Sequence, residues 1–277
     1  MLRLSAETSS GDVVIGVSSY CIPHYHNSKT SSLAVARKLS KCCKDITYTQ
    51  VCRGFKDQAS VKSALVKAAA VKQIKTILTV TGDKASATHI SVFDLIRTID
   101  KKRFKVAAAV VFARKNEAKR VAEKAAAGAT VFYTQPVFPS DTGRLVSVLK
   151  QISNISCSIN IGVFIPFQAA VCKKAAKEKP DFINDTSFIQ KLAAEEKKSP
   201  LAARSKTAEL AKNNLAAALK VAAVINKNRK SRCKVIGIHF FGLSDRIFSN
   251  GNKRVKVPAE QLLSSIIGTY SRLHKFS

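Results

Sequence analysis

Tryptophan is absent from the 277-residue sequence, aromatic residues make up 7%, and 18 acidic residues face 47 lysines and arginines. With so few aromatic residues, stacking of nucleic-acid bases on aromatic platforms is not indicated, and contact by Lys and Arg with phosphates is favoured. No apolar run approaches the roughly 20 residues that a membrane-spanning helix needs, so the sequence predicts a soluble or peripheral protein without a transmembrane segment.

The number and spacing of the cysteines argue against disulfide bonds and against a metal-binding motif. They number seven, an odd count, and none has the paired spacing of a metal-binding or redox motif, which favours reduced thiols in a reducing compartment. Cys21, His24 and His26 would make only half of a zinc site. We therefore predict no metal.

The net charge of +29 and the pI of about 10.1 are the strongest features of the composition. Self-repulsion at this charge destabilises a compact state, and a polyanionic partner is the usual compensation. A solvated lysine coat is the simpler alternative. An anionic membrane surface is disfavoured because the apolar helix faces consist mostly of alanine and valine. Nucleic acid is the favoured partner.

Short β-branched runs alternate with alanine-lysine segments from residue 13 onward, the pattern of repeated βα units around a parallel sheet. Five of the six intervals between the starts of successive runs are about 25 to 35 residues, the length of a βα unit. We predict an α/β fold of the TIM type, a (β/α) barrel. The runs are Val13 to Ser18, Ile46 to Val51, Thr76 to Val80, Lys105 to Val111, Thr130 to Tyr133, Ser158 to Phe164 and Lys234 to Phe240.

The chain is predicted to form one domain over residues 1–277, with a helical insertion at about 166–232 and a basic C-terminal segment at 250–277. The insertion is expected to contain a helix, a connector closed by Pro200 and a second long helix. Apolar residues at helical spacing, such as Val61, Leu65 and Ala68, are expected to form the core.

Polar residues stand at the ends of two predicted strands, where the sites of (β/α) barrels form. Asp83 follows the run that ends at Val80, and Gln135 follows the run that ends at Tyr133. Both would face one cavity. For Asp83, capping of a helix start is an equally good interpretation.

Four segments resemble the methylenetetrahydrofolate reductase family, a family of flavin-dependent (β/α) barrels. Residues 123–138 resemble its sixth βα unit, a helix ending in Lys-x-x-Ala-Gly-Ala and a strand ending in Thr-Gln. Gly82-Asp83 resembles the end of its fourth strand, Ile165-Pro166 the proline after its seventh strand, and residues 237–244 its final strand. The four segments stand in the family's order and spacing, and the resemblance as a whole covers roughly residues 13 to 250.

This resemblance implies that Asp83 lies near the flavin ring, that Gln135 binds the pterin of the folate, and that Lys124 meets the flavin phosphates of FAD. It also implies a first strand bearing a general-acid glutamate, which this sequence does not supply, since Glu7, the only early glutamate, lacks the family's prolines and a following helix. Hydride transfer to the folate needs that acid. We expect the barrel to be incomplete at its first strand and closed by the N-terminal segment or by a partner.

Clusters of lysine and arginine flank two predicted strands on both sides, so charge lies at both ends of the barrel rather than at one mouth. Such a distribution is typical of a protein surrounded by nucleic-acid phosphates, as in a large ribonucleoprotein. The predicted nucleic-acid contacts are Lys101, Lys102, Arg103, Arg114, Lys115, Lys119, Arg120, Lys227, Arg229, Lys230, Arg232, Lys253, Arg254 and Lys256.

The sequence therefore favours a non-catalytic basic subunit of an RNA-containing assembly that binds RNA and other subunits and holds no cofactor. The Arg- and Ser-bearing start favours a mitochondrial location, and hence the mitochondrial ribosome, over a cytoplasmic one. The alternative is an FAD-dependent methylenetetrahydrofolate reductase that uses Asp83, Gln135 and Lys124. A third interpretation is a scaffold in a membrane or respiratory complex, with lysines on acidic subunits or cardiolipin.

Overall fold

A computed structural model describes residues 2–9, 12–22, 32–41, 43–81, 90–178, 182–183, 185–241, 246–250, 253–257 and 266. For residues 2–22 and 246–257 only the backbone is described. The statements below refer to these parts of the chain.

All seven predicted strands are present, and strands alternate with helices along the chain, so the predicted α/β fold is confirmed. Strands β1, β9 and β10 were not predicted. The strands are β1 Leu2–Ser9, β2 Asp12–Ile22, β3 Ile46–Val51, β4 Ile74–Val80, β5 Lys105–Val110, β6 Val131–Pro136, β7 Cys157–Phe164, β8 Cys233–Phe241, β9 Arg246–Asn250 and β10 Lys253–Val257.

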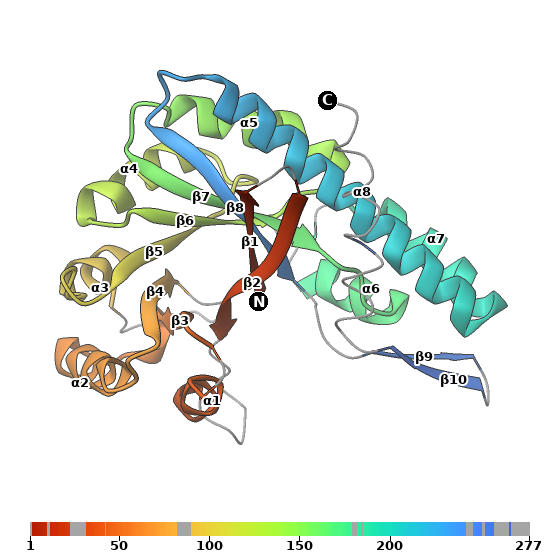
Figure 1. The fold of residues 1–277 in the computed structure, drawn as a ribbon, viewed down its shortest axis with the longest axis horizontal. Coiled ribbons are helices and arrows are strands. Elements are labelled where there is room, and N and C mark those ends of the chain that lie inside the picture. The colour runs from red at the N-terminus through yellow and green to blue at the C-terminus, as the bar shows by residue number, and fades with distance from the viewer. Residues whose placement is uncertain are drawn as a thin grey trace.

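Strands β3 to β8 form an all-parallel sheet in sequence order (Figure 1). Strand β2 joins it in parallel with β3 through Tyr20 to Ile22. At the place of the expected first strand, β1 pairs antiparallel with both β2 and β8. The pairings thus return to the starting strand. No helix separates β1 from β2.

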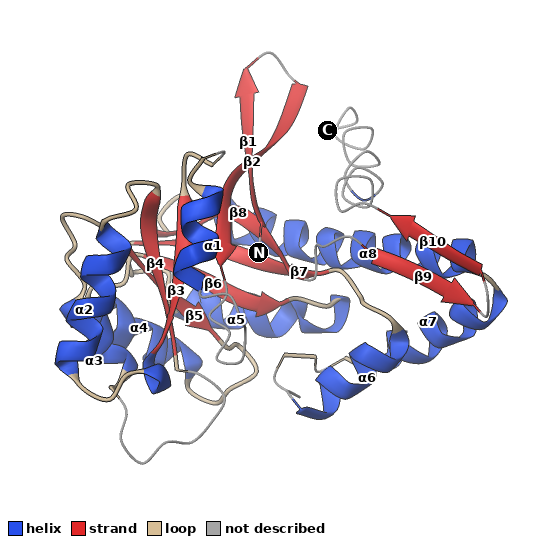
Figure 2. Cartoon of the chain, turned by 90° about the horizontal axis from the view of Figure 1, so that it is seen from below, coloured by secondary structure: helices blue, strands red, loops and turns tan. Residues whose placement is uncertain are grey.

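The β1-β2 hairpin extends beyond the sheet (Figure 2). Tyr20 pairs with Ile46, the first residue of β3, so the residues of β2 before Tyr20 continue past the beginning of β3. On the other side, pairing between β1 and β8 is confined to Leu2 through Leu4. The remainder of the hairpin therefore pairs only with itself.

Helices cover the outer face of the sheet (Figure 1). Between them and the sheet lies the main apolar core, which includes the predicted residues Val61, Leu65 and Ala68. The helices are α1 Ser32–Leu39, α2 Gln58–Ala69, α3 Val92–Thr98, α4 Glu117–Ala127, α5 Thr142–Gln151, α6 Ala169–Glu178, α7 Ser187–Lys198 and α8 Pro200–Lys227, with short 3-10 turns at Cys52–Gly54 and Pro139–Asp141.

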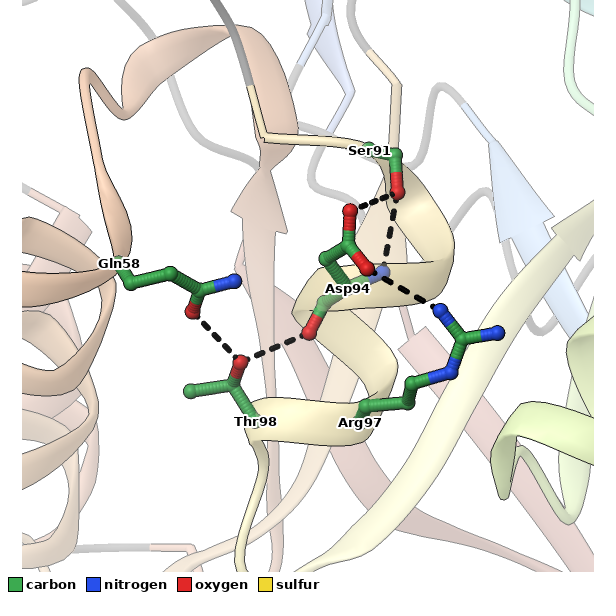
Figure 3. Close-up of polar contacts among 5 residues, drawn as sticks. All are labelled: Gln58, Ser91, Asp94, Arg97 and Thr98. Carbon is green, nitrogen blue, oxygen red and sulfur yellow. Dashed lines mark hydrogen bonds and ion pairs between the residues drawn. The ribbon is translucent and has the colours of Figure 1, made fainter.

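Acidic residues at the starts of two helices form hydrogen bonds and an ion pair with residues close by in the sequence. Asp57 and Ser60 form a reciprocal capping box at the start of α2. At the start of α3, Ser91 caps the Asp94 N–H and donates to its carboxylate, which also accepts from Arg97 (Figure 3). These carboxylates are held by helix caps and nearby ion pairs rather than by distant basic clusters.

The insertion contains three helices, α6, α7 and α8, so the predicted number of two was wrong. Helix α6 ends at Glu178, two positions before Pro180 in the sequence, and proline disfavours helical geometry in the residue preceding it. Pro200 begins α8 instead of ending a connector, because the first helical turn has no hydrogen bond for its missing N–H to break. Strands β9 and β10 lie beside α7 and α8.

Candidate nucleic-acid interface

The N-terminal ends of the parallel strands gather many cations on one face. Each of these residues lies between a helix end and the strand that follows, or within the first two residues of that strand, and parallel strands all begin at the same end of a sheet. We call this the N-terminal face. Its cations are Lys41, Lys44, Lys72, Lys75, Lys101, Lys102, Arg103, Lys105, Lys227, Arg229, Lys230, Arg232 and Lys234.

A cavity of about 770 Å³ opens on this face between the beginnings of β3 and β8. Its charged lining residues are Lys75, Lys101, Lys102, Arg103, Lys105 and Asp45. A second hollow of about 420 Å³ adjoins it through the shared Lys75 and adds Lys41, Lys44 and Lys72. The structure therefore brings one predicted cluster together with lysines from two other loops.

Most of these cations have no internal ion pair. Among the described residues, no ion pair is found for Lys44, Lys72, Lys75, Lys101 or Lys102. Among the described side chains of this face, the acidic ones are Asp45 and Asp100, and an Asp100 carboxylate oxygen already accepts the Lys102 backbone N–H at 2.9 Å. The face thus carries a large uncompensated positive charge, which attracts polyanions.

Arg103 and Lys234 have structural roles on the same face. The Arg103 guanidinium donates to the carbonyls of Ala69 and Ile74 at 3.2 and 3.4 Å and lies over the Phe104 ring. The Lys234 ammonium donates to the Asn228 carbonyl at 3.0 Å. Basic groups at helix ends also offset the helix dipole, so these two side chains stabilise the fold.

The predicted cluster Arg114, Lys115, Lys119 and Arg120 lies at the opposite end of β5. Arg114, Lys115 and Lys119 are exposed, whereas Arg120 lies 3.7 Å from the buried Glu117 carboxylate. The predicted cluster Lys227 to Arg232 is exposed and lies before β8, on the N-terminal face. Lys253, Arg254 and Lys256 lie on β10, and their side chains are outside the described part of the structure.

Lys124, expected to meet flavin phosphates, is 4% exposed and points into the protein. Its ammonium donates to the Ala109 carbonyl at 2.6 Å and pairs with Glu117 at 3.1 Å. The same Glu117 oxygen accepts the Val111 N–H at 3.0 Å, where β5 ends. Burial lowers the pKa of Lys124, although Glu117 opposes the shift. Helix α4 is thereby fastened to β5.

Of the two residues expected to bind flavin and folate, only Gln135 is described. Its Oε1 atom is buried and has no hydrogen-bond partner among the described residues. Asp83 lies outside the described residues, so its expected proximity to Gln135 stays a prediction. A Cβ at Gly162 would lie 2.7 Å from the Gln135 carbonyl oxygen and 2.7 Å from Phe241 Cε2, which shows how closely these groups pack.

Phenylalanines fill the space at the C-terminal ends of β7 and β8. Phe164, at the end of β7, makes ring contacts with Phe138, Phe167, Phe182 and Phe188 at centroid distances of 5.9 to 6.1 Å. Phe182 in turn lies 4.9 Å from the Phe241 ring. The insertion supplies Phe167, Phe182 and Phe188, so it covers the strand ends near Gln135 with apolar side chains.

Polar side chains line the inner face of the sheet below these rings. His239 is fully buried, and its Nε2 lies 3.0 Å from the Thr134 carbonyl oxygen. Because a carbonyl only accepts, Nε2 carries the proton, and burial lowers the pKa of His239 to about 3. The Tyr133 ring meets His239 edge-on at 5.1 Å, and its hydroxyl lies 3.4 Å from Thr47 Oγ1.

Sequence reasoning missed Lys41, Lys44, Lys72 and Lys75, which are spaced along the chain instead of forming a run. The signal that could have found them is position: each precedes or begins a predicted strand, and the residues that precede parallel strands share one face.

No protein-family model matches the chain, and the search of curated proteins finds no match. Within the described ranges, no helix is both long and apolar enough to cross a membrane. No group of three or more potential metal ligands occurs among the described side chains. The resemblance to methylenetetrahydrofolate reductases, and every functional role taken from it, stays a prediction.

Proposed function

We propose that this chain is a non-catalytic, RNA-binding subunit of a large ribonucleoprotein. The observation that carries the proposal is the N-terminal face, where cations from three successive loops line two adjoining hollows and the acidic residues among the described side chains are Asp45 and Asp100. Phosphates along a nucleic-acid backbone supply the missing negative charge, and release of their counterions drives binding.

The surroundings of the expected catalytic residues support the absence of catalysis. The Lys124 ammonium is occupied by Glu117 and the Ala109 carbonyl, which leaves it poorly placed to hold a flavin phosphate. Aromatic side chains of the insertion pack over the strand ends near Gln135. The unpartnered Oε1 of Gln135 is the one observation that favours the alternative, an FAD-dependent methylenetetrahydrofolate reductase.

The proposal includes the architecture. We take the fold to be a TIM-type barrel, related to the methylenetetrahydrofolate reductases, in which an antiparallel hairpin stands in place of the first βα unit. The pairing of β1 with β2 and β8 supports this assignment. A general-acid glutamate on a parallel first strand has no counterpart in that arrangement. We further propose other protein subunits as partners, a mitochondrial location, and the mitochondrial ribosome as the assembly.

Absorbance and sedimentation of the natively purified protein test this function. A heavy particle that absorbs at 260 nm and has no flavin band near 450 nm (a property of the cofactor) is the expected result. The sedimentation should collapse to that of the free chain as salt is raised, because phosphate contacts weaken with ionic strength. A light, RNA-free, yellow protein would contradict the proposal and support the reductase alternative.

A further inference from the structure

The cavity of the N-terminal face is larger than contact with a phosphate backbone requires. Its volume of about 770 Å³ falls within the range of small-molecule pockets, about 300–1,000 Å³. Five hydroxyl-bearing residues line the cavity together with the cations. Those hydroxyls belong to Thr47, Thr76, Thr130, Ser158 and Tyr133.

Apolar surface lies beside the hydroxyls. Ile236 of β8 lines the cavity and is 45% exposed, although most large apolar residues of the sheet are buried. Tyr133 is 4% exposed, and its contacts with Thr47 and His239 hold its ring in place. The cavity therefore offers three kinds of surface: exposed cations, hydroxyl groups, and apolar carbon for a flat ring.

A nucleotide has groups that match these three surfaces: a charged phosphate, a hydroxyl-bearing ribose, and a flat base with polar edges. We propose that the cavity binds one unpaired nucleotide, with its phosphate at Lys75, Lys101 and Lys105 and its base against Ile236. This inference rests on the proposed RNA-binding function. Proteins read RNA sequence mostly at unpaired nucleotides, whose bases are free to leave the stack. A paired base is held in its helix and would not enter.

Two RNA hairpins of equal length and charge test the proposal, one fully paired and one with a single-nucleotide bulge. Dissociation constants are measured for the native chain and for Ser158→Phe and Ile236→Phe, which fill the cavity without changing charge. The exposed Ser205→Phe on α8 is the control. We expect the native chain and the control to prefer the bulged hairpin about ten-fold. The cavity-filling variants should bind both hairpins with the native affinity for the paired one.

The outcomes separate this inference from the function on which it rests. Salt-dependent binding of both hairpins with equal affinity by the native chain would overturn the inference and leave RNA binding intact. Failure to bind either hairpin would overturn the proposed function. Adenosine and uridine monophosphate test the source of the nucleotide: binding of a monophosphate, lost in Ile236→Phe, without any bulge preference would assign the cavity to a free nucleotide and overturn the RNA assignment. If Ser158→Phe does not fold, Ile236→Phe alone decides.

Discussion

Lys101 lies over Gly128, so that a Cβ at position 128 would overlap the Lys101 Cε atom. Gly128 ends α4 with φ 117°, a conformation that favours glycine, and its N–H bonds back to carbonyls of that helix. The contact places the stem of Lys101 beside the mouth of the N-terminal cavity, which both residues line. Gly128 thus both ends α4 and lies at the proposed interface.

Gly128→Ala is expected to lower the free energy of unfolding by about 1–2 kcal/mol, the cost of left-handed backbone for a residue with a Cβ. It should also weaken RNA binding, because Lys101 must move. Gly143→Ala is the control: it lies within α5 and nothing is near its Cβ position, so it should stabilise the chain by about 0.5–1 kcal/mol. Urea unfolding measures both. Equal stability of the two variants would contradict this account of Gly128.

Lys124→Met is expected to cost about 3–5 kcal/mol of stability, because it removes the ammonium that donates to the buried Glu117 carboxylate and leaves only the more distant Arg120 as its cation. Adding Glu117→Gln should recover most of that loss, since the buried charge is removed. Denaturant unfolding of the two single variants and the double variant measures this coupling. A Lys124→Met protein as stable as the native chain would show that the ammonium is free for another role, such as a flavin phosphate.

His239 predicts a dependence of stability on pH. Its folded pKa of about 3 lies below the ordinary value of 6.5, so between these values the unfolded chain binds the extra proton. Stability should therefore fall as pH decreases from about 6.5 toward 3, by about 1.4 kcal/mol per pH unit from this group. His239→Gln should flatten the stability profile between pH 4.5 and 6.5. An unchanged slope in that variant would contradict the assignment of a buried neutral His239.

The hydrophobic periodicity of the sequence was enough to predict the seven strands β2 to β8 and the main core. Runs such as Ile46 to Val51 combine β-branched residues with turn-forming flanks, and that local signal persists in the fold. Strand β1 escaped prediction because its place depends on pairing with β8, more than two hundred residues away, and its own sequence resembles a targeting segment. Strands β9 and β10 are short and polar, and they depend on packing against α7 and α8.

The candidate sites were harder to predict than the fold. Local sequence shows how many charges a segment carries but not which of them have partners. Lys124 was assigned to a cofactor although Glu117 stands seven residues earlier, two helical turns away on the same face of α4. The lysines of the N-terminal face were missed for a different reason. They are scattered in the sequence, and only the parallel topology of the sheet brings them to one face.

The most direct test of the central claim is the salt dependence of RNA binding for two matched triple variants. One carries glutamine at the exposed Lys44, Lys72 and Lys75 of the N-terminal face, and the other carries glutamine at exposed lysines of the insertion, Lys173, Lys177 and Lys191. Both lose the same charge. We predict that the slope of log K against log salt becomes less negative by about 2–3 in the first variant and stays close to native in the second. Equal changes in both would show that the charge acts as a diffuse coat, and would contradict an interface on the N-terminal face.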